Sequence, residues 1–242
     1  MISILKKEFS AFLNSLIAYI VISVFLTGMG LLMWVFPDTA VLVYGFADMD
    51  TLFSFAPYVF MFLIPAITMR SFAEEKKSGT LELLFTKPLS DWQIILGKFL
   101  ACWLLVFIAL LPTLLYYYSI VQLGNPPGNI DAAAVAGSYF GLVLLAAVFT
   151  AIGLLASSLT VNQIVAFISG VFLCFLFYHA FDAASSLNVW SSYALFIKQL
   201  GLLYHFDSAA RGLIDSRDLL YFLSLTGIML LLTKTVLGSR QW

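Results

Sequence analysis

Long runs without a charged side chain alternate with short polar stretches along the 242 residues of the chain. A bilayer core about 30 Å thick requires about 20 apolar residues in a spanning helix. An ionised side chain at the bilayer centre costs roughly 2.5–3.5 kcal/mol, so uncharged runs are typical of membrane spans. The pattern therefore predicts an all-α membrane protein. The uncharged runs cover residues 11–36, 51–69, 99–130, 132–181 and 219–233.

These runs predict six transmembrane helices. The run at 132–181 is too long for one span, and the polar stretch SSLTVNQ at 157–163 divides it into two. The breaker cluster GNPPG at 124–128 ends the span before it. The expected spans are residues 15–36, 52–69, 99–123, two helices within 132–181, and 218–237.

The distribution of lysine and arginine predicts the orientation of these spans. Cytoplasmic loops of membrane proteins carry an excess of these residues. With the N-terminus inside, nine of the 12 cations lie on the inner side and three on the outer side. With six spans, both termini are then cytoplasmic. The outer cations are Lys198, Arg211 and Arg217, and the inner ones are Lys6, Lys7, Arg70, Lys76, Lys77, Lys87, Lys98, Lys234 and Arg240.

Two segments outside the spans have helical character. Residues 1–14 place Ile2, Leu5 and Phe9 on one helical face, which predicts an amphipathic helix in the inner interface. A simple positively charged anchor is an overlapping interpretation. Residues 185–217 are partly apolar but contain Lys198, so we expect an extracytoplasmic segment of short outer-leaflet or re-entrant helices rather than a seventh span.

The charged residues are concentrated in one predicted cytoplasmic loop, residues 70–92. Ser71 and Glu74 have the spacing of a capping box, as do Ser90 and Gln93, so helices are expected to begin at both places. Gly79 interrupts the first helix, and Thr80 caps a second one. Its residues Leu81, Leu84 and Phe85 share a face, and Lys87-Pro88 ends it. Such a loop either holds topology alone or forms a docking surface, which the apolar ridge favours.

This loop resembles the coupling region of ABC-2 type transporter permeases. The resemblance rests on EEKKSGTLELLFTKPLSDWQIILGKFLA at residues 74–101 and on the outer segment YHFDSAARGLIDSRDLLYFLS at 204–224. The chain is also similar, nearly end to end, to the GldF family of gliding-motility-associated permease subunits of Bacteroidetes. Stretches such as LLPTLLYYYSIVQLGNPPGNID (110–131) and ASSLTVNQIVAFI (156–168) carry that similarity.

The resemblance implies one six-helix permease domain over residues 1–242, in the inner membrane. It further implies a separate GldA-like ATPase that binds ATP and Mg²⁺, a GldG-like second permease subunit or a second copy of the chain, and surrounding lipids. Exposed ion pairs contribute about 0–1 kcal/mol each, so apolar residues would supply most of the affinity for the ATPase. The residues expected to dock it are Arg70, Glu74, Glu75, Lys76, Lys77, Gly79, Thr80, Leu81, Glu82, Leu84, Phe85 and Pro88.

Motifs for chemistry within the chain are lacking. Gly97-Lys98 is followed by Phe99 and has no upstream glycine at the phosphate-loop spacing, so we expect no nucleotide site, no catalytic residue and no cofactor. Cys102 and Cys174 have no metal-ligand spacing and are expected as buried apolar residues. The formal net charge of −1 gives no nucleic-acid footprint. An ion-coupled carrier usually has ionisable residues at mid-membrane, which this chain almost lacks. A non-transporting membrane scaffold for a motility machine stays open.

Some polar and small residues allow two interpretations. His179 and Asp182 form either a proton or metal site or ordinary interfacial positions, and His205 and Asp207 either line a vestibule or are solvated. We expect the second interpretation for both pairs. Small residues at four-residue spacing let membrane helices approach closely, either within the subunit, as we expect, or across a dimer. They are Ala133, Gly137 and Gly141.

Overall fold

The computed structural model describes residues 1–85, 90–186, 193–212 and 215–239, and the regular structure within them is helical. This confirms the predicted all-α class. A short 3₁₀ turn (Leu111–Thr113) joins α7 to α8, and a π-helical turn (Leu176–Ala180) joins α10 to α11. The α-helices are α1 Ile2–Leu13, α2 Leu16–Trp34, α3 Val41–Tyr44, α4 Asp50–Thr68, α5 Arg70–Lys77, α6 Thr80–Phe85, α7 Asp91–Leu110, α8 Leu114–Leu123, α9 Ala132–Leu159, α10 Gln163–Phe175, α11 Phe181–Ser185, α12 Ala194–Gln199, α13 Leu202–Ala210 and α14 Ser216–Gly238.

Among the described residues, five helices are long and apolar enough to cross a membrane. They are Asp50–Lys77, Asp91–Leu123, Ala132–Leu159, Gln163–Ser185 and Ser216–Gly238. α1 and α2 meet at an angle of 66° and supply a sixth candidate when they are counted together. The structure thus has five or six candidate spans, and the predicted six is the upper value; the bend separates the N-terminal α1 from the apolar α2.

α9 forms the centre of the bundle and packs against α4, α10, α13 and α14. It is apolar around most of its circumference, as expected for a helix that is enclosed by others. It ends at Leu159, and the side chain of Asn162 caps the start of α10 by accepting from the N–H of Ile164 at 2.9 Å. The predicted division of the long uncharged run at 157–163 is therefore confirmed.

Small residues let α9 approach its neighbours closely. A methyl group added at Gly153 would lie 2.1 Å from Thr68 Oγ1 on α4, and one added at Gly141 would lie 2.7 Å from the Cβ of Ala209 on α13. Gly137 faces Gly212 in the same way, at 2.8 Å. Gly137 and Gly141 thus pack within the subunit. Ala133, in the first turn of α9, is by contrast exposed.

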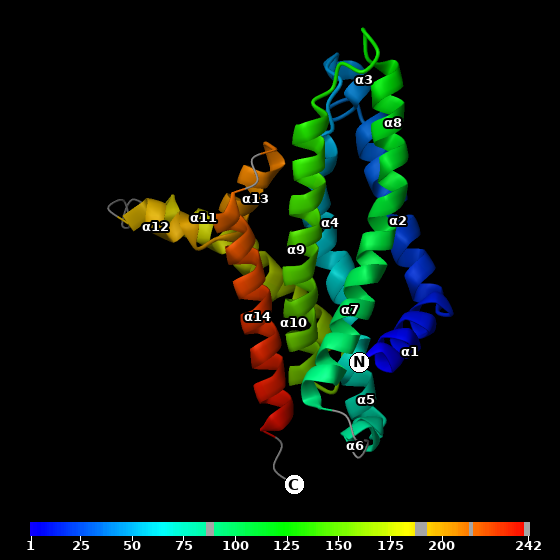
Figure 1. Cartoon of the computed structure of the whole chain (residues 1–242), viewed down its shortest axis with the longest axis vertical. Helices are drawn as coiled ribbons and strands as arrows, with labels where there is room; N and C mark the ends of the chain where they lie inside the picture. Colours follow the sequence, from blue (N-terminus) through cyan, green and yellow to red (C-terminus); the bar gives the residue numbers. More distant parts are fainter. Residues whose placement is uncertain (86–89, 187–192, 213–214, 240–242) are drawn as a thin grey trace.

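The described parts of the segment between the last two spans form short helices, as predicted. Gly201 precedes α13, and Gly212 follows it with a φ of 76°, a left-handed conformation that favours glycine. Figure 1 shows α11 and α12 extending sideways from the bundle at the level where α14 begins.

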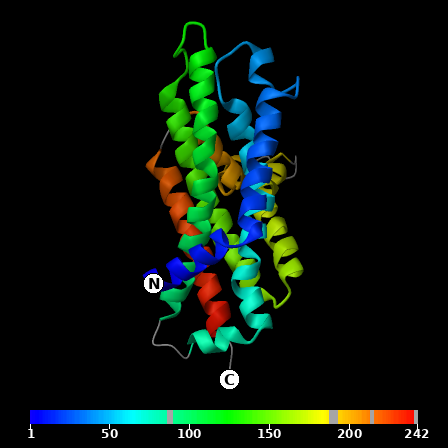
Figure 2. The same cartoon turned by 90° about the vertical axis from the view of Figure 1, so that its right-hand side faces the viewer.

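One end of the bundle gathers elements that are distant in sequence. Figure 2 shows α1, the last turn of α14 and the pair α5–α6 near this end, which we call the α5 end. α3 and the loop between α8 and α9 lie at the opposite end (Figure 1).

Candidate functional site at the α5 end

α5 and α6 continue from α4 beyond a break in the helix. α4 ends at Thr68, α5 begins at Arg70, and Gly79 separates α5 from α6 with a φ of 70°. Gly79 therefore interrupts the helical segment as predicted, because a left-handed backbone suits glycine. Thr80, however, is the first residue of α6 and does not precede it as a cap. After residues 86–89, which lie outside the described part, α7 begins with the predicted capping box of Ser90 and Gln93.

A serine from the centre of the bundle holds the start of α5. Ser157 Oγ accepts hydrogen bonds from the backbone N–H groups of Phe72 and Ala73, at 3.0 and 3.1 Å. It donates to the carbonyl oxygen of Met69 at 3.0 Å. The predicted cap at Ser71 is wrong. The helix breaks at Met69, and the first N–H groups of α5 are bonded by Ser157 of α9 rather than by Ser71. Ser71 lies inside α5, with its hydroxyl 3.6 Å from Cys102 Sγ.

A buried lysine joins three helices at the same place. Lys98 of α7 is 1% exposed, and its ammonium lies 3.0 Å from Glu8 Oε1 on α1 and 2.9 Å from Glu75 Oε1 on α5. It also donates to the carbonyl oxygen of Ser71 at 2.8 Å. An ammonium has three N–H donors, so this arrangement satisfies all of them. We call Lys98, Glu8, Glu75 and the Ser71 carbonyl the Lys98 cluster.

Two further contacts fix α5. The ammonium of Lys76 donates to the carbonyl oxygen of Ser158, in the last turn of α9. Carbonyl groups at a helix C-terminus have no partner within the helix and carry a partial negative charge, which favours a nearby cation. On the outer face of α5, Arg70 pairs with Glu74 at 2.8 Å. α5 is therefore attached to α9, α7 and α1 by polar bonds as well as by apolar packing.

The residues expected to dock an ATPase have different environments. Leu81 is 1% exposed and belongs to the apolar core, so it does not contribute to an exposed ridge. Glu75 and Lys76 are engaged within the chain, as described above. The side chains of Leu84 and Phe85, and the whole of Pro88, lie outside the described part. The residues that present an exposed surface are Lys77, Gly79, Thr80 and Glu82.

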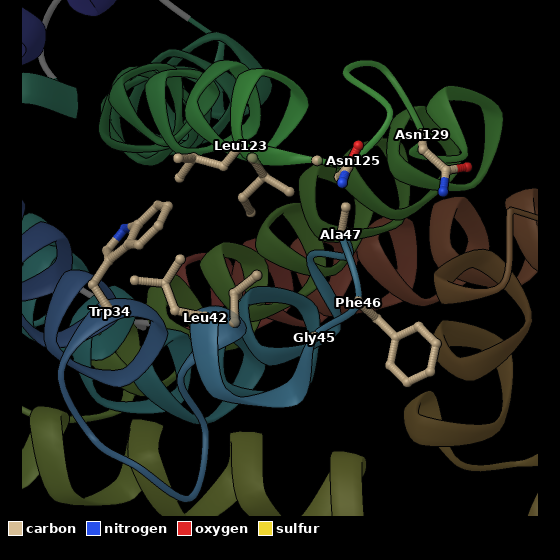
Figure 3. A pocket seen from close by; sticks show the side chains of 11 residues that line it. Trp34, Leu42, Gly45, Phe46, Ala47, Leu123, Asn125 and Asn129 are labelled. Carbon is tan, nitrogen blue, oxygen red and sulfur yellow. The ribbon is translucent and has the colours of Figure 1, made fainter.

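Two cavities of similar size lie at opposite ends of the bundle. One, of about 260 Å³, is lined by charged residues of α1 and α5 and reaches Lys98. The other, also about 260 Å³, lies between the α2–α4 connection and the α8–α9 loop. Figure 3 shows Trp34 and Leu42 on one side of it and Leu123 on the other. Its lining carries no charged side chain, so it offers no ionic site.

The histidines behave differently from each other. His179 lies 3.1 Å from Tyr58 Oη, whereas Asp182 pairs with Lys198 at 3.2 Å, so this pair forms no common site. His205 is buried and bonded to Asp218, which makes its predicted solvated position wrong.

Burial raises the pKa of the neighbouring Asp207, while Arg211 and Lys198 oppose that shift. No group of three potential metal ligands occurs among the described residues. Cys102 and Cys174 are both buried and free.

The sequence matches one protein family. The profile of the ABC-2 family transporter proteins covers residues 42–197, more than half of the chain. The chain belongs to this family. No curated protein matches the sequence. The matched range includes α4 to α11, and therefore both the α5–α6 pair and the central α9.

Family membership gives the coarse function. The chain is a multi-pass membrane protein and a permease subunit of an ABC transporter. ABC-2 permeases are membrane transport components that work with an ABC ATPase subunit. The family thus agrees with the resemblance found in the sequence at the level of ABC-2 permeases.

Proposed function

We propose that a separate ABC ATPase docks on the α5–α6 end of this permease and moves the bundle through α5. By its resemblance to the GldF family, the complex serves gliding motility or an associated secretion process, in the inner membrane of the cell. A GldA-like ATPase, which binds ATP and Mg²⁺, is the proposed partner. A GldG-like subunit or a second copy of the chain completes the membrane part.

The attachment of α5 is the observation that carries this proposal. A helix that transmits force must be fixed to the helices that it moves. Ser157 fastens the start of α5 to α9, and the Lys98 cluster fastens its middle to α7 and α1. Lys76 fastens its end to the last turn of α9. A movement imposed on α5 would therefore reach three other helices.

The contact surface for the ATPase is the exposed face beyond these bonds. Lys77, Thr80 and Glu82 are exposed around Gly79, so charges of both signs can set the register of docking. Leu84 and Phe85 follow on the same segment and are proposed as the apolar part of the contact. Arg70 and Glu74 lie at the edge, half-exposed and paired with each other. Glu75 and Lys76 are proposed to contribute without touching the ATPase, by holding α5 against α7 and α9.

The orientation follows from the distribution of positive charge. The α5 end carries most of the lysine and arginine residues, and such residues are enriched on the cytoplasmic side. In this proposed orientation, α5 and α6 face the cytoplasm, where an ATPase and its ATP are found. Residues 204–224 then lie on the extracytoplasmic side.

Co-purification with a GldA-like ATPase tests the docking surface. The variant Leu84→Asp/Phe85→Asp is expected to lose the ATPase, because charge replaces the apolar contact. Val43→Asp/Phe46→Asp is the matched control, since both residues are exposed at the opposite end of the bundle. Loss of the ATPase from both variants, or from neither, would contradict the proposal.

Cysteine labelling tests the orientation independently. In intact cells a membrane-impermeant maleimide should label Phe46→Cys and leave Lys77→Cys unlabelled. The native Cys102 and Cys174 are buried and need not be removed. Labelling of Lys77→Cys from outside would overturn the orientation and with it the docking proposal.

A further inference from the structure

A cleft of about 850 Å³ opens between α12, α13 and the first turns of α14. Ligand pockets in proteins commonly have volumes of about 300–1,000 Å³. α14 is apolar and long enough to cross a bilayer, so its first turn is expected at the level of lipid headgroups. Figure 1 shows α12 running sideways from the bundle at this level. We call this space the α12–α14 cleft.

The floor of the cleft contains a carboxylate with one unused oxygen. His205 Nε2 lies 2.8 Å from the carbonyl oxygen of Gln199, which can only accept, so Nε2 carries a proton. His205 Nδ1 bonds to Asp218 Oδ1 at 2.7 Å, and the ring stacks on Tyr221 with centroids 3.9 Å apart. Asp218 Oδ2 is buried and has no hydrogen-bond partner. A buried acceptor without a partner is unfavourable, so the site calls for a donor.

Two arginines at the same cleft form no ion pair in the described part of the chain. Arg211 and Arg217 both line the cleft and are exposed, and neither forms an ion pair in the described part of the chain. The third outer cation, Lys198, is already paired with Asp182. A guanidinium presents planar N–H donors that match the geometry of a phosphate. The cleft therefore holds two arginines that can bind an anion, close to a carboxylate that can accept a hydrogen bond.

The rim of the cleft is apolar. Phe196 on α12 and Leu220 on α14 line it and are 64% and 66% exposed. Large apolar side chains beside a charged cavity, at the end of a spanning helix, fit a molecule with a charged head and an apolar body. A soluble polar ligand would leave them in contact with water.

We propose that the α12–α14 cleft binds the headgroup of an aminophospholipid. Its phosphate contacts Arg211 and Arg217, and its ammonium donates toward the carboxylates of Asp218 and Asp207. Its acyl chains follow Phe196 and Leu220. A choline headgroup has no N–H donor, and a glycerol headgroup offers only neutral hydroxyl donors, so neither matches an ammonium as a partner for two carboxylates. This site is independent of ATPase docking and exists in the permease subunit alone.

Native mass spectrometry of the purified full chain, depleted of lipid in detergent, tests this site. Dioleoyl phosphatidylethanolamine is expected to bind at least tenfold more tightly than the phosphatidylcholine with the same acyl chains. This comparison uses the unmodified protein and so does not depend on a variant that folds. Equal affinity for the two lipids, or tighter binding of phosphatidylglycerol, would overturn the proposal.

A matched pair of variants locates the site. Arg211→Gln/Arg217→Gln is expected to weaken phosphatidylethanolamine binding at least tenfold. Lys6→Gln/Lys7→Gln removes the same charge from exposed positions on α1 and should leave that binding unchanged. An equal loss in both variants would show that lipid binds by general charge attraction and not in the cleft. Circular dichroism and the melting temperature confirm that each variant is folded.

Discussion

Charged residues gather at two places in this membrane protein, and the two places differ in whether their cations are paired. In the Lys98 cluster, the ammonium has three partners and is 1% exposed, although Glu75 Oε2 has no donor. In the α12–α14 cleft, two arginines have no ion pair among the described residues, and Asp218 Oδ2 has no donor. The first place borders a cavity of about 260 Å³, whereas the second opens on about 850 Å³ of space.

The difference distinguishes a structural link between helices from a binding site. We call the Lys98 cluster, which links α1, α5 and α7, the joint. A cation whose donors are all used within the chain holds helices together and has nothing left for a ligand. A buried acceptor that is left without a donor costs free energy in the isolated protein, and a ligand that supplies a donor can recover that cost. The comparison predicts that substitutions at the Lys98 cluster act mainly on stability and coupling, while substitutions in the cleft act mainly on binding.

The largest expected effect comes from removing the cation of the joint. Lys98→Met leaves Glu8 and Glu75 buried near each other without a counter-charge. Breaking a buried pair in this way costs about 3–5 kcal/mol. We expect a marked fall in the melting temperature in detergent and faster proteolysis of residues 70–85.

A neutral version of the joint provides the control. Replacing a whole buried ionic group with apolar residues of similar volume is often close to neutral for stability. Lys98→Met/Glu8→Met/Glu75→Met is therefore expected to recover most of the loss. A single variant that melts within about 2 °C of the wild type would show that the cluster is no joint.

The sequence could predict what depends on local pattern. The uncharged runs gave the spans because the bilayer demands a minimum apolar length. Gly79 broke the helical segment and Ser90 capped α7, because both effects act within a few residues. The family resemblance likewise depended on a continuous motif around α5 and α6.

The contacts that build the candidate site could not be read in the same way. Lys98 counted only as one of the inner cations, and its partner Glu8 lies 90 residues away. Ser157 looked like part of a polar turn, yet it caps a helix 85 residues before it. Leu81 shared a helical face with Leu84, but packing against the bundle buries it. Such contacts are set by how helices pack, which one sequence does not display.

The next effect separates two adjacent serines at the α5 end. Ser157→Ala leaves the buried N–H groups of Phe72 and Ala73 without an acceptor, which is expected to cost about 2–3 kcal/mol. Ser158→Ala is the matched control, because that hydroxyl bonds only to the carbonyl of Leu155 in its own helix. Chemical denaturation in detergent measures both. Equal losses would mean that Ser157 does not hold α5.

A packing substitution tests how the cleft is attached to the bundle. Gly141→Ala places a methyl group 2.7 Å from the Cβ of Ala209, so α13 must shift away from α9. Overpacking of this kind costs about 1–3 kcal/mol. Ala209→Gly in the same chain should restore most of the stability and the lipid binding. If the double variant stays as unstable as the single one, the contact between α13 and α9 is not the cause.

The smallest expected effect concerns an aspartate in the cleft and its dependence on pH. Burial raises the pKa of Asp207 above its ordinary value of 3.8, Asp182 adds to this, and Arg211 and Lys198 oppose it. The folded state then holds the proton more tightly than the unfolded state, so stability falls as the pH rises from 3.8 through the raised pKa. Asp207→Asn removes that loss and is expected to stabilise the lipid-free protein by about 0.5 kcal/mol or less at pH 7. Its advantage should shrink toward pH 4 in thermal denaturation. A variant that is less stable than the wild type at pH 7 would show that attraction to Arg211 outweighs burial. The charges of the cleft would then be paired within the chain, like those of the Lys98 cluster.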